Sequence, residues 1–151
     1  MPEKETLERA HEDAREGKSP STQAGEFVRE EMHHIREGKH GAASPQQAIA
    51  IGLSKARRAG VKLQAPQKGR TSASTRKKAE SDYEKGQSHR QRKPSSRRSK
   101  ATSQALKKKG SSAASHSALS AQARRSALVR GSASRHNAAM KASRTRSRRS
   151  E

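Results

Sequence analysis

The sequence predicts an all-α protein: a short helical hairpin module followed by a largely disordered, partly helical basic tail. Only 27% of the 151 residues are apolar and 1% are aromatic, against roughly 45–50% apolar residues in a typical globular chain. Two Ser-Pro pairs, at Ser19 and Ser44, have the pattern of helix starts. The net charge of +21 is concentrated in the second part of the chain. Such a composition cannot bury one large core.

The charge divides the chain into segments. Residues 1–63 hold eleven Lys/Arg and ten Asp/Glu, whereas residues 64–151 hold 24 Lys/Arg and four Asp/Glu. No acidic residue occurs from Lys85 to Ser150. We therefore expect a polar N-terminal helix within 1–18, a helical hairpin over 19–63 and a basic low-complexity tail over 64–151.

Helix signals are clear in the first 63 residues. Residues 3–16 alternate acidic and basic side chains and end at a glycine, which predicts a short polar helix. A second helix is expected from Pro20 to Glu37, and a third from Pro45 to about Arg58. The third begins with a capping box, Ser44-Pro-Gln-Gln47. The short loop between them is typical of antiparallel neighbours.

Apolar residues at helical spacing predict the hairpin core. Gly52 is expected to let the helices approach closely, whereas Glu30 is expected to face solvent. Two helices cannot cover all of this apolar surface, so a homo-oligomer formed through the hairpin is a possible partner arrangement. The predicted core residues are Phe27, Val28, Met32, Ile35, Ile49 and Leu53.

In the tail, residues 72–85 could form a charged helix that ends at Gly86. Residues 99–109 and 115–130 each have a serine N-cap, a body of Ala and Leu, a basic end and a following glycine. These two stretches are predicted to be nascent helices, because their like charges oppose folding until an anion neutralises them. We expect residues 64–151 to lack a fixed tertiary fold in isolation.

Residues 19–63 resemble a family of small basic bacterial proteins that contain a domain of unknown function. The resemblance is carried by GEFVR (25–29), HHIREGKHG (33–41) and above all QAIAIGLSKARRAG (47–60). Some members of that family are labelled plasmid stabilisation proteins. The resemblance attaches no catalytic residues to the chain and implies an association with DNA.

The acid-free basic run predicts nucleic-acid binding by neutralisation of phosphates. DNA is favoured over RNA, and the binding is expected to ignore sequence because bases have almost no aromatic side chain on which to stack. We expect a cytoplasmic, nucleoid-associated protein. The predicted contacts are Lys77, Lys78, Arg90, Arg92, Lys93, Arg97, Arg98, Lys100, Lys107, Lys108, Lys109, Arg124, Arg125, Arg130, Arg144, Arg146, Arg148 and Arg149.

Two alternatives stay open. The hairpin could be a helix-turn-helix whose second helix reads bases through Ser54, Lys55, Arg57 and Arg58, although the connection is longer than usual. Otherwise, the hairpin could be a protein-interaction or stress-related structural module. The tail would then tether it electrostatically to RNA, the ribosome or an acidic membrane.

Other classes of function have weaker signals. Glu30, His33, His34, Glu37 and His40 suggest a metal site, but their order does not fit a known zinc motif, and a solvated helix face is the preferred interpretation. No nucleophile–base set is evident, so we expect no enzymatic activity, cofactor or small-molecule substrate. The sequence contains no cysteine and no apolar run long enough to span a membrane.

Overall fold

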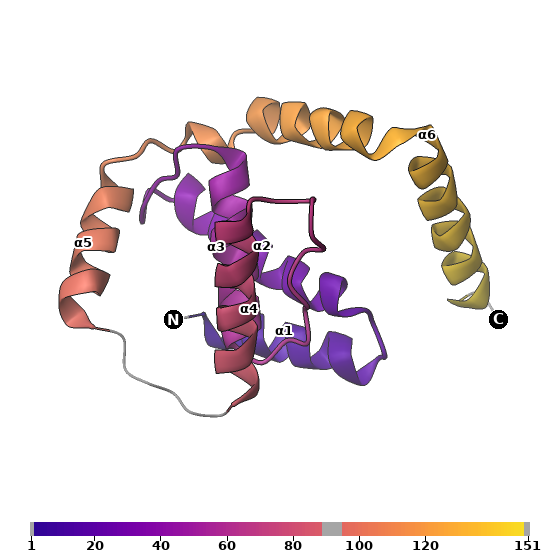
Figure 1. Cartoon of the computed structure of the whole chain (residues 1–151), viewed down its shortest axis with the longest axis horizontal. Helices are drawn as coiled ribbons and strands as arrows, with labels where there is room; N and C mark the ends of the chain where they lie inside the picture. The colour runs from indigo at the N-terminus through magenta and orange to yellow at the C-terminus, as the bar shows by residue number, and fades with distance from the viewer. Residues whose placement is uncertain (1, 89–94, 150–151) are drawn as a thin grey trace. The chain divides into compact units, whose positions relative to one another are not determined.

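In the computed structural model, which describes residues 2–88 and 95–149, every regular element is helical. Figure 1 shows these elements in chain order. The all-α prediction is therefore confirmed. The elements are α1 (Lys4–Arg15), α2 (Pro20–Arg36), α3 (Pro45–Arg58), α4 (Ala73–Gln87), α5 (Ser96–Lys107), the 3-10 helix η1 (Ser112–Ala114) and α6 (His116–Arg149).

The predicted caps fix the starts of α2 and α3. Ser19 accepts a hydrogen bond from the Thr22 amide, and Ser44 accepts one from the Gln47 amide at 3.2 Å. The Gln47 side chain reaches back to accept a hydrogen bond from the Ala43 amide at 2.7 Å. The capping box therefore works reciprocally, although its return bond comes from the residue before the N-cap.

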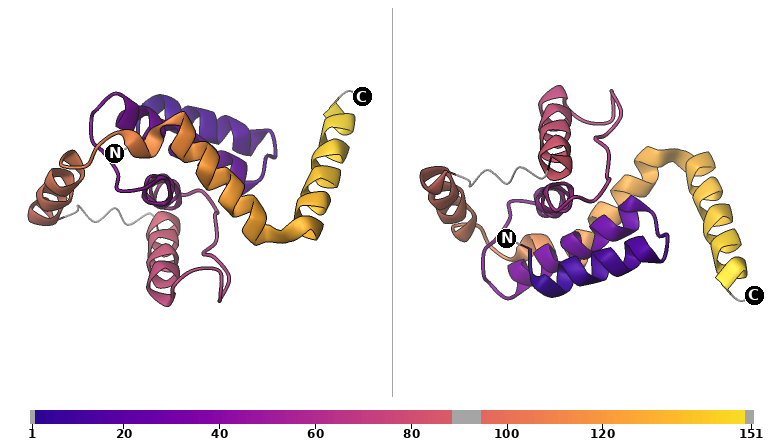
Figure 2. Two further views of the ribbon diagram at one scale, coloured as in Figure 1. Left: turned by 90° about the horizontal axis from the view of Figure 1, so that it is seen from above. Right: turned by 90° about the horizontal axis from the view of Figure 1, so that it is seen from below.

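Helices α1, α2, α3 and α4 pack in succession, with α3 between α2 and α4. Figure 2 shows α3 nearly end-on while α1 and α2 run across the view, so α3 crosses α2 instead of lying antiparallel to it. Gly52 lies at this crossing. A Cβ atom there would be 2.7 Å from the Cα of Val28, so only glycine permits this separation.

The core is built from small residues around one aromatic ring. Phe27 and Ile35 are fully buried, and Met32 is 7% exposed. Val28, Ile49 and Leu53, which were also predicted to be core, are only partly buried. The reason lies on α3, whose buried line runs through Ala48, Gly52 and Ala56, one turn apart. Ala10 of α1 closes the same cluster.

Helix α4 corrects the expectation that everything after residue 63 is a tail. Ala79 and Asp82 are buried. Asp82 accepts hydrogen bonds from Ser54 Oγ at 2.6 Å and from Arg58 Nε at 2.7 Å. Gly86, expected to end this helix, lies inside it against the Arg57 carbonyl. Small residues and one buried carboxylate thus dock α4 without any large apolar side chain.

The expectation of a largely disordered tail is also wrong, because its described residues form α5, η1 and α6 besides α4. Helices form through local hydrogen bonds, and Ala, Leu, Lys and Arg are strong helix formers. The helix predicted over 115–130 is followed by a break at Gly131, where φ is 73°. Helix then resumes to Arg149, a stretch for which no helix was predicted.

The chain divides into two compact units, Met1–Ser115 and His116–Glu151. In the first unit, η1 packs on α2 and α3, and Arg36 Nε donates to the Ala114 carbonyl at 2.9 Å. The end of α5 is attached to the loop after α2, since the Gly41 amide donates to the Leu106 carbonyl at 3.0 Å. Of the helices in the described residues, none has the length and apolar character needed to cross a bilayer.

Candidate nucleic-acid interface

The structure distributes the predicted basic residues over three helices. Lys77 and Lys78 lie on α4, and the group from Arg97 to Lys109 lies on α5 or just beyond its end. The remaining residues lie on the two segments of α6, on either side of Gly131. Three of the predicted contacts lie outside the described residues, namely Arg90, Arg92 and Lys93.

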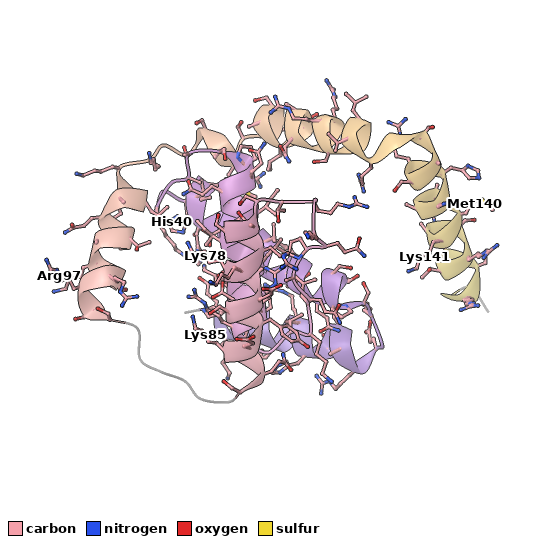
Figure 3. All side chains as sticks on the ribbon, in the orientation of Figure 1. His40, Lys78, Lys85, Arg97, Met140 and Lys141 are labelled. Carbon is pink, nitrogen blue, oxygen red and sulfur yellow. The ribbon has the colours of Figure 1, made fainter. Side chains whose placement is uncertain are left out.

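These basic side chains are exposed and lack acidic partners. Each predicted Lys or Arg whose side chain the structure describes is exposed. None of them forms an ion pair with another described residue. In Figure 3, Lys78 and Lys85 project from α4, Arg97 from α5 and Lys141 from α6. Their charges are therefore available to an external anion.

Helix α5 gathers part of its charge on one side. At 3.6 residues per turn, Arg97, Lys100 and Lys107 fall within an arc of about 80°. On the last turns of α6, by contrast, Arg144 and Arg148 lie about 40° apart around the helix and Arg146 points to nearly the opposite side. A basic stripe can follow one phosphate backbone, whereas charge divided between two sides of a helix has no single preferred face.

The basic residues of α3 form contacts within the bundle, although Arg58 stays exposed at its surface. Lys55 Nζ lies 2.7 Å from Glu31 Oε2, and Arg58 pairs with Asp82. Arg57, which is 6% exposed, donates to the Leu63 carbonyl at 3.1 Å, and burial lowers the pKa of its guanidinium. Together with the bond from Ser54 to Asp82, these contacts occupy all four residues considered for base readout.

A second polar cluster surrounds Glu30 of α2 and includes Glu3, Thr6 and Lys55. Glu30 is 4% exposed, contrary to the expected solvent-facing position. Its carboxylate accepts hydrogen bonds from the Glu3 amide at 3.0 Å and from Lys55 Nζ at 3.3 Å. Burial raises its pKa, but these two donors and Thr6 outweigh burial and hold the pKa of Glu30 below its ordinary value.

Glu31 is the functional candidate that the sequence analysis missed. Its side chain is fully buried, and its carboxylate belongs to a group with His34 and His40 in which one ligand atom per residue lies within 4.8 Å of the others. The sequence did contain a signal for this burial. Glu31 lies four residues after Phe27 and four residues before Ile35, so it shares their buried face of α2. His33 and Glu37 are exposed, as a solvated face requires.

Comparison with known proteins leaves the family open: no family model, no curated protein and no solved structure matches this chain.

Proposed function

We propose that this protein is a non-enzymatic nucleic-acid-binding protein that contacts phosphates without reading base sequence, with duplex DNA as the preferred ligand. The observation that carries the proposal is the exposed, acid-free basic surface of α5 and α6. Helix α6 carries nine Lys/Arg and no acidic residue. Phosphates would supply the anions that this surface lacks and release their counterions.

Two further features support binding without base readout. The chain has one Phe and one Tyr; Phe27 is buried and Tyr83 is on α4, so α5 and α6 carry no Phe, Tyr or Trp on which a base could stack, and their only rings are the imidazoles of His116 and His136 on α6. The basic residues of α3 are committed to internal contacts. Association with the nucleoid or with a plasmid would follow from such binding, and the family resemblance implies an association with DNA.

Salt dependence tests the proposal. The affinity should fall by about 0.9 in log K per unit of log salt for each duplex phosphate neutralised. With about eight contacts, raising the salt from about 50 to 200 mM should weaken binding on the order of 10⁴-fold. Unrelated duplexes of equal length should bind alike in a fluorescence titration.

A matched pair of variants separates local contacts from overall charge. Arg144, Arg146 and Arg148 of α6 are replaced by Gln in one variant, and exposed Lys4, Arg15 and Lys62 in the other. Both lose three charges, but only the first should lower the salt slope, by up to about 2.7. Equal losses in the two variants, or a strong preference for one sequence, would refute the proposed interface.

A second candidate is favoured by two apolar residues on the same helix. Leu128 is 73% exposed and Val129 is 83% exposed, and basic helices with exposed apolar residues bind anionic lipid surfaces. In this alternative, the helix tethers an interaction module to an acidic membrane. Stronger binding to anionic vesicles than to DNA, abolished by changing Leu128 and Val129 to Ser, would favour it.

A further inference from the structure

Glu31 has an unusual environment for an ionisable side chain. It is completely buried on α2, and neither carboxylate oxygen accepts a hydrogen bond from any donor in the described part of the chain. Lys55 Nζ is 2.7 Å from Oε2, close enough for an ion pair but without hydrogen-bond geometry. A buried carboxylate without hydrogen bonds is costly, so Glu31 lacks a hydrogen-bonding partner although Lys55 is near.

The charges around Glu31 also show too little positive charge near the two buried carboxylates. Two buried carboxylates, Glu30 and Glu31, share the single ammonium of Lys55. Lys39, the other nearby cation, pairs with exposed Glu3 and Glu37. With neutral histidines, one negative charge therefore remains buried without compensation. A bound cation would remove the cost of that charge.

Two histidines face this carboxylate with suitable geometry. Glu31 and His34 are three residues apart on α2, the Glu-x-x-His spacing used in metal sites of helical bundles. His40 comes from the loop after α2, and its Nε2 lies 3.4 Å from Glu31 Oε1, the oxygen not adjacent to Lys55. The two imidazole rings meet edge to face, with centroids 6.1 Å apart.

Each histidine has an outer partner that leaves its other nitrogen available. His34 Nε2 lies 2.8 Å from Glu3 Oε1, so a proton on Nε2 leaves the lone pair on Nδ1. His40 Nδ1 can donate to the Gly41 carbonyl at 3.3 Å, which leaves the lone pair on Nε2. Such carboxylate and carbonyl partners orient the histidines of metal sites.

We propose that Glu31, His34 and His40 bind one divalent transition-metal ion, with Zn²⁺ as the best fit. Two imidazoles and one carboxylate are a known zinc ligand set, and the fourth position would hold water. Ligand atoms around tetrahedral zinc lie about 3.3 Å apart. The group, now within 4.8 Å, needs to close by up to about 1.5 Å, which the loop residue His40 can supply.

The site opens to solvent at one of its ligands, and its position indicates a structural role. A pocket of about 250 Å³ between α1 and α2 is lined by His34, whereas Glu31 and His40 are not part of its lining. His40 precedes Gly41, which packs against Lys109 and bonds to Leu106. An ion on His40 would hold this loop against α2 and thereby fix the end of basic helix α5.

The test uses the full-length chain, freed of metal by a chelator and titrated calorimetrically with Zn²⁺. One equivalent should bind, and Co²⁺ should give the visible absorption of a tetrahedral ion. Zn²⁺ at about 100 times Kd should raise Tm by roughly 10 °C. His34→Gln and His40→Gln should each weaken binding at least about 100-fold, and Glu3→Gln about tenfold.

His33→Gln is the matched control, because His33 is adjacent to His34 but exposed, and it should leave Kd unchanged. If circular dichroism shows that His34→Gln does not fold, the loop variant His40→Gln decides. Absence of saturable Zn²⁺ binding, or an equal loss in His33→Gln, would overturn the proposal. Lys55 would then be the cation that balances the charge of Glu31.

Discussion

At the scale of single residues, two helical glycines have opposite roles. Gly52 touches the backbone of Val28, where α3 crosses α2, whereas a Cβ on Gly25 of α2 would meet no atom within 4 Å. Glycine costs a helix about 0.5–1 kcal/mol relative to alanine. A substitution at Gly25 therefore tests helix propensity alone, whereas a substitution at Gly52 also tests the packing of α3 on α2.

We predict that Gly52→Ala lowers the free energy of unfolding by about 1–3 kcal/mol, because the added Cβ forces α2 and α3 apart. Gly25→Ala should raise it by about 0.5–1 kcal/mol. Urea denaturation followed by circular dichroism measures both. A stabilised Gly52→Ala variant would show that the helices do not cross as closely as described.

Basic residues in this chain also differ by location. Lys55 and Arg57 belong to the same helix and have the charge of the tail residues, yet they contact a buried carboxylate and backbone carbonyls. A count of Lys and Arg cannot distinguish such residues from exposed ones. Their tertiary partners decide which charges remain for an external ligand.

At the scale of elements, α4 shows how a polar helix joins a bundle. Asp82 is 5% exposed and is bonded to Ser54 and Arg58 of α3. Asp82→Asn should lower the free energy of unfolding by about 1–2 kcal/mol, a value kept small because Arg58 is largely exposed. Hydrogen exchange of the α4 amides should become faster.

Glu80 provides the control on the same helix, since it pairs with Arg76 at the surface. Glu80→Gln should change stability by less than about 0.5 kcal/mol. Similar effects of the two substitutions would mean that Asp82 does not hold α4 on α3.

The boundaries of α1, α2 and α3 were predictable from the local sequence, unlike those of the later helices. The predicted third helix matches α3 at Pro45 and Arg58, because a serine cap, a proline and a glycine stop act within one or two turns. The docking of α4 and η1 was not predictable in this way. Their contacts use alanine, glycine, backbone groups and the Asp82 carboxylate, none of which gives an apolar periodicity.

At the scale of the whole molecule, the first compact unit ends at Ser115, far beyond the predicted hairpin. We predict that residues 1–115 melt cooperatively within a few degrees of the full chain. Residues 1–65 should not, because removal of α4 and η1 exposes the faces of α2 and α3 that they cover. Differential scanning calorimetry of the two fragments tests this.

If residues 1–65 melted like the longer fragment, α4 and η1 would contribute nothing to the bundle. The coverage of the hairpin by α1, α4 and η1 also removes the reason for expecting self-association through its apolar stripe. Oligomeric state stays a prediction without structural support.

The helical class, the starts and ends of the first three helices and the concentration of positive charge after residue 63 follow from the amino-acid sequence without the structure. Each depends on composition or on residues within one or two helical turns of each other. Tertiary structure alone decided that α3 crosses α2 at Gly52, that α4 docks through Asp82 and that Glu31 meets His34 and His40. These contacts join residues from different elements of the chain, and local sequence signals do not specify which elements pack together.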